Sequence, residues 1–202
     1  MSQYFETPSG PENRRRIRAR IWDRDYEFET ADGVFSGDRL DPGTAVLLRT
    51  CPPPPAEGAH RLLDLGCGFG PIGVALAREC PGARVDAVDV NDRALALTRD
   101  NAALAGVAAR VRVMRPDDVP GDVRYDEIWS NPPIRIGKDA LHALLVAWLD
   151  RLAPDGCAYL VVGKNLGADS LQAWLGARGY PAARLASAKG FRVLRVAARL
   201  GA

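Results

Sequence analysis

The chain has 202 residues, of which 47% are hydrophobic, and a formal net charge of +2. This length fits one α/β domain with a substantial core and leaves no room for a second large domain. The nearly balanced charge is mild for a protein that binds a polyanion and decides nothing by itself, so the local clustering of basic residues is what matters.

The cysteines and histidines do not form a metal-binding pattern. They are Cys51, Cys67, Cys80, Cys157, His60 and His142. None of the cysteines belongs to a Cys-x-x-Cys pair, so we expect reduced thiols and no metal site. No stretch approaches the roughly 20 apolar residues that cross a bilayer, and the first residues lack the apolar segment of a secretion signal. We therefore expect a cytoplasmic protein with no membrane association.

The first predicted element is a β-hairpin. Residues 16–22 alternate strictly between arginine and apolar residues, and residues 26–30 alternate again after a turn. One face of the first strand carries a basic stripe of Arg14, Arg16, Arg18 and Arg20. Such a stripe suits either the tracking of RNA phosphates or the protection of an exposed strand edge.

A short helix and a loop follow the hairpin. Asp41 supplies an N-cap and Pro42 the first helical residue of a helix that runs through residues 44–49, and a proline run then ends it. We expect residues 1–55 to form this N-terminal extension and residues 56–202 to form the main domain.

From residue 61 onward, predicted strands and helices alternate. The expected strands are residues 61–65, 83–90, 110–114, 125–130, 157–162, 184–188 and 191–200. The expected helices are residues 72–79, the segment between Asn91 and Gly106, and residues 138–152 and 169–178. This order predicts an α/β fold with a Rossmann-like, mostly parallel sheet of seven strands. Only Lys189-Gly190 separates the last two strands, so the sheet should end in an antiparallel hairpin.

A glycine-rich turn follows the first strand of this sheet. In LLDLGCGFGPIG, residues 62–73, the glycines let a ligand lie against the backbone at the start of the next helix. Gly68, Gly70 and Gly73 also satisfy the dinucleotide pattern G-x-G-x-x-G, a weak signal alone, and a tightly packed loop is a further alternative. Asp64 at the strand end would repel a pyrophosphate and attract an ammonium group, which favours S-adenosylmethionine over a dinucleotide.

Two later strands also end near acidic residues. Asp89 suits a carboxylate that accepts hydrogen bonds from both ribose hydroxyls, although NAD enzymes use this arrangement too. Asp117 is placed to accept a hydrogen bond from an adenine amino group, with Asp118 as a rival and a solvated turn acid as the alternative. The expected cofactor site comprises Asp64, Gly66, Cys67, Gly68, Gly70, Asp89, Val90, Asp117, Asn131, Thr44 and Phe35.

The motif that separates these alternatives follows the fourth strand, at the edge where open α/β sheets bind ligands. An NH2 nitrogen conjugated to a ring or a carbonyl attacks a methyl group poorly until acceptors hold its hydrogens. Asn131 offers a side-chain carbonyl and Pro132 a main-chain carbonyl, on a chain kept rigid by two prolines. The alternative is a turn that merely ends the strand. The expected catalytic residues are Asn131, Pro132, Pro133 and Ile134.

These motifs together resemble a known family. DLGCGFG, Asp89 and Asn131-Pro132-Pro133 resemble the class I S-adenosylmethionine-dependent amino-methyltransferases. NPPIRIGK with VFSGDRLDPGT resembles the small-subunit rRNA guanine-N2 methyltransferase family, roughly from Val34 to the C-terminus. The resemblance implies a class I methyltransferase fold, methylation of guanine N2, and rRNA or a ribosomal subunit as the partner. It also implies that the segment with Phe35, Ser36 and Thr44 closes over cofactor and substrate, with a packing role as the alternative for Phe35.

Two departures from that family leave the substrate open. Ile134 stands where many relatives carry an aromatic residue that stacks on the base. The bacterial relatives also carry an additional N-terminal domain that helps to recognise RNA, and a partner, a homodimer or a smaller substrate would have to compensate here. Adenine N6 and a protein glutamine amide are therefore alternative acceptors. An NAD-dependent oxidoreductase and a catalytically silent nucleic-acid-binding module are the alternatives from other classes.

Overall fold

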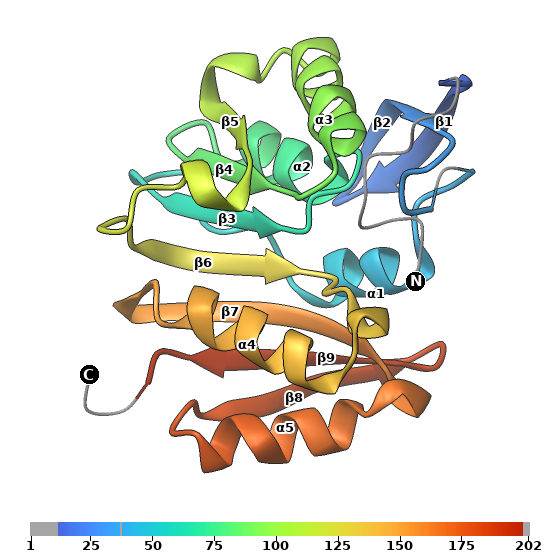
Figure 1. Ribbon diagram of the computed structural model, residues 1–202. Helices are drawn as coiled ribbons and strands as arrows, with labels where there is room; N and C mark the ends of the chain where they lie inside the picture. Colours follow the sequence, from blue (N-terminus) through green and yellow to red (C-terminus); the bar gives the residue numbers. More distant parts are fainter. Residues whose placement is uncertain (1–11, 37, 200–202) are drawn as a thin grey trace.

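The computed structural model describes residues 12–36 and 38–199. A hairpin of β1 (Arg14–Ile21) and β2 (Arg24–Ala31) precedes α1 (Pro42–Thr50) and a central seven-stranded sheet (Figure 1). The strands of that sheet are β3 (Arg61–Leu65), β4 (Arg84–Val88), β5 (Val111–Met114), β6 (Tyr125–Ser130), β7 (Leu152–Gly163), β8 (Ala182–Ala188) and β9 (Phe191–Ala197). The remaining helices are α2 (Pro71–Glu79), α3 (Asp92–Leu104), α4 (Lys138–Leu149) and α5 (Ala168–Ala177).

The strand order is β5-β4-β3-β6-β7-β9-β8. Strands β3 to β7 pair in parallel, whereas β9 pairs antiparallel with both β7 and β8. The predicted fold class, including the C-terminal hairpin and the N-terminal hairpin, is therefore confirmed.

The chain reverses its direction of travel across the sheet between β3 and β6. It moves outward from β3 to β5 and then returns to place β6 on the other side of β3. Leu65 and Ser130 pair at the carboxyl ends of these strands, and the Ser130 hydroxyl donates a 2.7 Å hydrogen bond to the Leu65 carbonyl. Such a switch point is where open α/β sheets bind ligands. The glycine turn and the Asn-Pro-Pro segment thus begin side by side.

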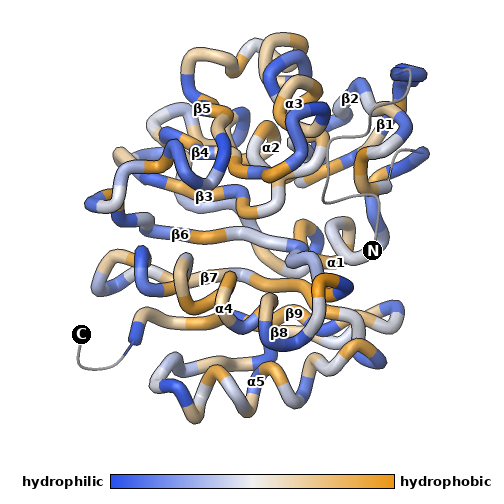
Figure 2. The backbone as a smooth tube through the Cα atoms, in the orientation of Figure 1, coloured by the Kyte–Doolittle hydropathy of each residue, from blue (hydrophilic) through white to orange (hydrophobic). Residues whose placement is uncertain are grey.

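Apolar side chains cover both faces of the sheet. One core cluster joins the hairpin, α1, α2 and α3 to one face, and a second joins α4 and α5 to the other. Figure 2 shows hydrophobic residues along the central strands and within the helices that cover them. Ile17 and Ile21 of β1 are buried in the first cluster, and the Asn101 side chain of α3 bonds both backbone groups of Glu29. The hairpin therefore shares a core with the sheet, while the predicted domain boundary at residue 55 stays a prediction.

The predicted helix at residues 138–152 was too long, because α4 ends at Leu149 and β7 already begins at Leu152. Pairing shifts from Tyr125–Leu152 to Glu127–Cys157, so β7 has three more residues than β6 in this interval and bulges there. A Cβ on Gly156 would lie 2.8 Å from the Tyr125 carbonyl oxygen, so the bulge needs glycine there. Periodicity could not reveal this strand start, because a bulge interrupts the alternation. The last strand likewise ends at Ala197 rather than at residue 200.

Asp64 holds the glycine turn against the sheet. Gly66, Gly68 and Gly70 have φ values of 74°, 58° and 87°, a region that favours glycine. The Asp64 side chain is fully buried, and its Oδ2 accepts a 2.7 Å hydrogen bond from the Gly73 N–H in the first turn of α2. Its Oδ1 has no hydrogen-bond partner among the described residues. Burial raises the pKa of Asp64 to about 7.

We predict that Asp64→Asn gains stability relative to the wild type as the pH rises from 5 to 8. The pKa of Asp64 is raised from 3.8 to about 7 on folding, so the stability that its protonated form contributes is complete below pH 3.8 and is lost as the pH rises through about 7. An asparagine still accepts from Gly73 but cannot ionise. The unfolding free energies of the variant and the wild type are measured by thermal and urea unfolding at pH 5 and at pH 8. We expect the difference between the two proteins to change between these pH values by an amount on the order of a few kcal/mol. A difference that stays constant with pH would contradict this assignment.

Candidate active site

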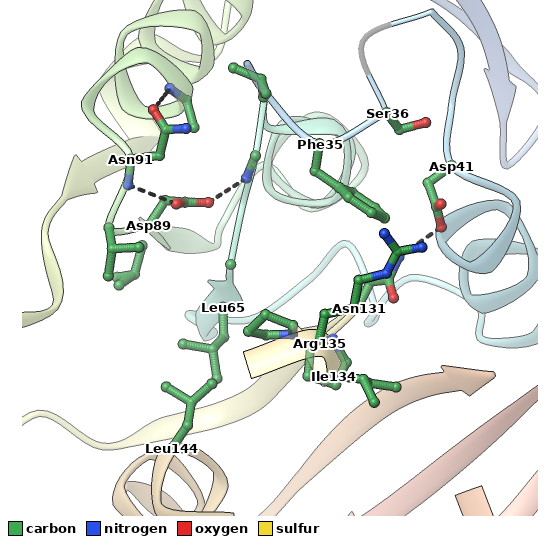
Figure 3. A pocket seen from close by; sticks show the side chains of 18 of the residues that line it. Phe35, Ser36, Asp41, Leu65, Asp89, Asn91, Asn131, Ile134, Arg135 and Leu144 are labelled. Atoms are coloured by element: carbon green, nitrogen blue, oxygen red, sulfur yellow. Dashed lines mark hydrogen bonds between the residues drawn. The ribbon is translucent and has the colours of Figure 1, made fainter. Parts of the chain in front are cut away.

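A cavity of about 480 Å³ opens at the carboxyl edge of the sheet, beside the switch point (Figure 3). Most of its wall is apolar. The polar and charged residues on the wall are Ser36, Arg39, Asp41, Asp89, Asn91, Asn131 and Arg135. Asp89 lies on one side of the cavity and Asn131 with Asp41 on the other (Figure 3). An apolar cavity with a few convergent polar groups is typical of a small-molecule site.

Asp89 follows β4 and is half-buried at the cavity wall. Its Oδ2 accepts a hydrogen bond from the Gly68 N–H and its Oδ1 accepts one from the Asn91 N–H, both at 2.9 Å. Desolvation raises the pKa of Asp89, while these backbone N–H groups oppose the rise. Each carboxylate oxygen has a further lone pair, so the group can still accept from two neighbouring hydroxyls.

The side chain of Asn131 is held in one orientation by the start of α1. Its Nδ2 donates to Asp41 Oδ1 at 2.7 Å and to Thr44 Oγ1 at 3.1 Å (Figure 3). Because an ionised carboxylate only accepts hydrogen bonds, the amide nitrogen must face Asp41. The Asn131 carbonyl oxygen is therefore the atom left for a donor in the cavity. Asp41 Oδ1 also accepts from the Thr44 N–H at 2.9 Å, so one carboxylate caps α1 and orients the amide.

The residues after Asn131 form a tight turn on the wall. The Ile134 N–H donates to the Pro132 carbonyl at 2.9 Å, around a Pro133 with φ −75° and ψ 76°. The Pro132 oxygen keeps a second lone pair. Ile134 begins the short helix η4 (Ile134–Ile136) and lines the cavity, as do Pro132 and Pro133. Phe35, 49% exposed, and Phe191 supply aromatic surface on the same wall.

The other expected cofactor residues divide into two groups. Gly66, Gly68 and Val90 lie on the wall of the large cavity. Cys67 and Thr44 instead line an adjoining hollow of about 30 Å³, and burial raises the pKa of the Cys67 thiol, which keeps it neutral. Neither Asp64 nor Gly70 lines either space, so they shape the turn from behind. Direct contact between Asp64 and a cofactor stays a prediction.

The two candidate adenine acids lie in the short helix η3 (Pro116–Asp118). Both are exposed, and only Pro116 of this helix lines the cavity. Asp118 Oδ2 accepts a 3.4 Å hydrogen bond from the Arg115 N–H. Asp118 is therefore engaged within its own turn, which leaves Asp117 as the freer acceptor.

Three of the four arginines in the basic stripe of β1 pair with neighbouring acids, whereas Arg18 is exposed and has no ion pair among the described residues. Its recorded ion pairs join Arg14 to Glu12, Glu29 and Asp100, Arg16 to Glu27 and Glu29, and Arg20 to Asp23 and Asp25. Ile17 and Ile21 are buried behind it, as the alternation predicted. RNA binding by the stripe stays a prediction, and its pairing favours the protection of a strand edge.

Within residues 12–36 and 38–199, no group of three or more His, Cys, Asp or Glu side chains is placed to hold a metal ion. All four cysteines are buried and unpaired. None of the described helices has the length and apolar character to span a bilayer.

The amino-acid sequence matches a family model and is similar to known proteins. The family model of the methyltransferase small domain matches residues 25–195. "Uncharacterized protein YbxB" of Bacillus subtilis is 34% identical over 170 residues, which are 83% of either chain. Ribosomal RNA small subunit methyltransferase C of Aeromonas hydrophila is 35% identical over 142 residues, which are 69% of this chain but 39% of the relative.

A solved structure of a methyltransferase is also similar to this chain. The 16S rRNA N2 G1207 methyltransferase (RsmC) of T. thermophilus, in complex with AdoMet and guanosine, superposes with a TM-score of 0.75 at 25% identity. The match covers 95% of this chain and 52% of that chain, so this chain spans about half of that enzyme's length. Because the family model matches residues 25–195, most of the sequence, the chain belongs to the methyltransferase small domain family.

Proposed function

We propose that this chain is an S-adenosylmethionine-dependent methyltransferase that acts on an exocyclic amino group, with guanine N2 of rRNA as the acceptor. One observation carries the proposal, namely the fixed amide of Asn131, whose nitrogen is held by Asp41 and Thr44. The rRNA acceptor is supported by the names of two relatives and by the guanosine in the T. thermophilus complex.

The residues at the Asp89 side of the cavity fit the cofactor. Asp89 offers two oxygens to the vicinal hydroxyls of a ribose, while Val88, Val90 and Pro116 offer apolar surface to a flat ring. The glycine turn lets the ligand approach the backbone closely. When bound, the cofactor supplies a methyl group on a sulfonium, whose transfer is favourable without a strong base.

Asn131 and the segment after it prepare the acceptor. The Asn131 carbonyl accepts one hydrogen of the NH2 group, and the free lone pair of the Pro132 carbonyl accepts the other. With both hydrogens held, the nitrogen lone pair is no longer delocalised into the ring and is directed toward the methyl carbon. This positioning lowers most of the barrier to methyl transfer. As the N–C bond forms, the C–S bond breaks, and the nitrogen then releases one proton to water. Neither protein carbonyl changes its protonation state.

The proposal is tested by calorimetry with S-adenosylmethionine, followed by transfer of a tritiated methyl group. Total RNA, isolated ribosomal subunits and protein extract serve as competing acceptors. We expect label in RNA, and a fall in kcat of about 10²- to 10³-fold in Asn131→Ala, the scale of losing one preorganised polar group. Label in protein instead of RNA would discard the rRNA acceptor. Absence of cofactor binding would overturn the whole proposal.

Asp41 should act through Asn131. In Asp41→Ala the amide loses the partner that sets its orientation, so we expect kcat to fall by roughly 10-fold or more with little change in the affinity for S-adenosylmethionine. Asp41→Asn keeps an oxygen that can accept from both Thr44 and Asn131, so it should restore most of the activity. Because Asp41 also caps α1, the alanine variant should lose about 1 kcal/mol of stability. Equal kcat in the two variants would contradict a positioning role.

Asp89 and Asp117 should differ sharply in cofactor affinity. Asp89→Ala removes a carboxylate on the cavity wall, and we expect the Kd for S-adenosylmethionine to rise by roughly 10- to 100-fold, as for lost hydrogen bonds to a charged group. Asp117→Ala is the matched control, because this acid is exposed and lies off the wall. Calorimetry of both variants measures the contrast. An equal loss in Asp117→Ala would instead assign a hydrogen bond with the cofactor to Asp117.

A further inference from the structure

The cavity has a rim of cations on its acceptor side. We propose that Arg39, Arg135 and Lys164 bind the phosphodiester backbone on both sides of the nucleotide whose base enters the cavity. This inference rests on the proposed function, because it assumes that the acceptor is a base within a polynucleotide. It adds the residues that would recognise the strand.

The rim cations come from segments that are far apart in the sequence. Arg39 precedes the α1 cap by two residues, and Arg135 directly follows Ile134 in η4. Both line the cavity. Lys164 begins the short helix η5 (Lys164–Leu166), between the wall residues Gly163 and Leu166. Since β6 and β7 are parallel neighbours, the segments after them, η4 and η5, lie at the same edge of the sheet.

Arg135 lies on the side of the cavity that holds Asn131, Arg39 precedes Asp41 by two residues, and Lys164 directly follows β7, the neighbour of β6. Figure 3 shows Arg135 beside Asn131, with Phe35 above it, on the side away from Asp89. The Asp89 side of the cavity is the side that fits a ribose. The three cations therefore belong to segments at or next to the part of the cavity wall that holds Asn131.

The rim cations also lack counter-charges. All three are exposed, and within residues 12–36 and 38–199 none of their side chains has a recorded hydrogen bond or ion pair. Arg14, Arg16 and Arg20 of the basic stripe, by contrast, all pair with carboxylates. An arriving phosphate must compete with those carboxylates at the stripe, but it meets unpaired cations at the rim.

A nucleotide base as the acceptor explains why cations are expected at the mouth of the cavity. A base that is turned out of its strand enters the cavity, while its two phosphates stay outside at the mouth. Guanidinium groups bind phosphate oxygens in a bidentate manner, and an ammonium binds them as a point charge. A glutamine side chain of a protein acceptor would bring no such pair of charges. The rim thus favours a polynucleotide over a protein.

The test compares two triple variants of the full chain. The rim variant is Arg39→Gln, Arg135→Gln and Lys164→Gln, and the matched control is Arg14→Gln, Arg16→Gln and Arg20→Gln, which removes the same charge from the paired stripe. Binding to a labelled single-stranded RNA of about 20 nucleotides is measured from 50 to 200 mM salt. Methyl transfer is measured on that RNA and on free guanosine, which has no phosphate. Thermal melting and calorimetry with S-adenosylmethionine check the fold and the cofactor site of each variant.

We expect the slope of log affinity against log salt to fall by about 2 in the rim variant, from three phosphate contacts at about 0.7 each, and to stay near wild type in the control. The rim variant should also raise the KM for RNA by more than 10-fold, and it should raise the KM for free guanosine, which has no phosphate, by much less. A slope that falls only in the control would move RNA binding to the stripe and overturn the inference. A rim variant with an unchanged slope would also overturn it, even if RNA is methylated normally. Label that reaches only protein would overturn both this inference and the rRNA acceptor, whereas the other two outcomes leave the proposed function intact.

Discussion

The parallel pairing of β3 with β6 is the constraint on which the site depends. It brings together two turns that are 65 residues apart, and the hydrogen bond from Ser130 to the Leu65 carbonyl fixes where they separate. Beyond that point, the glycine turn bends toward α2 and the Asn-Pro-Pro segment bends toward α4. The cavity lies between the two turns because the strand order reverses there. A slip of β6 by one residue against β3 would turn Ser130 to the other face of the sheet and would remove its hydrogen bond to the Leu65 carbonyl.

The N-terminal segment completes the site instead of merely covering it. Asp41 caps α1 and at the same time receives the amide of Asn131, which lies 90 positions later in the chain. A helix cap is a rigid place for such a group, because the cap residue is already fixed by the first turn of the helix. The orientation of Asn131 is therefore stabilised by the folding of α1, and α1 is in turn packed against the sheet through Val46 and Leu47. A local unfolding of α1 should therefore also release the side-chain amide of Asn131 from its fixed orientation.

The sequence was sufficient for the architecture and for the two turns that carry the chemistry. Strand periodicity, the glycines and the Asn-Pro-Pro motif are local signals, and the structure has strands and helices close to those positions. It was not sufficient for contacts between distant segments. Asp41 could be recognised only as a cap, and nothing near Phe191 indicated that a residue of the last hairpin reaches the cavity. The bulge in β7 was missed for a related reason, since Gly156 is explained by the Tyr125 carbonyl of the neighbouring strand.

The polar groups at the acceptor side of the cavity select a type of nitrogen but not a molecule. Two carbonyl oxygens recognise an NH2 group, and guanine, adenine and a glutamine amide all present one. The apolar wall near Ile134 and Phe35 adds surface contact but few hydrogen bonds that could distinguish one ring from another. Selectivity must then come from groups that meet the parts of the substrate outside the cavity. The small net charge of +2 does not reveal such groups, because it is a sum over the whole chain. It counts the paired arginines on β1 and the unpaired cations at the rim alike. The distribution of charge around the cavity, more than its total, therefore decides which acceptor can stay long enough to react.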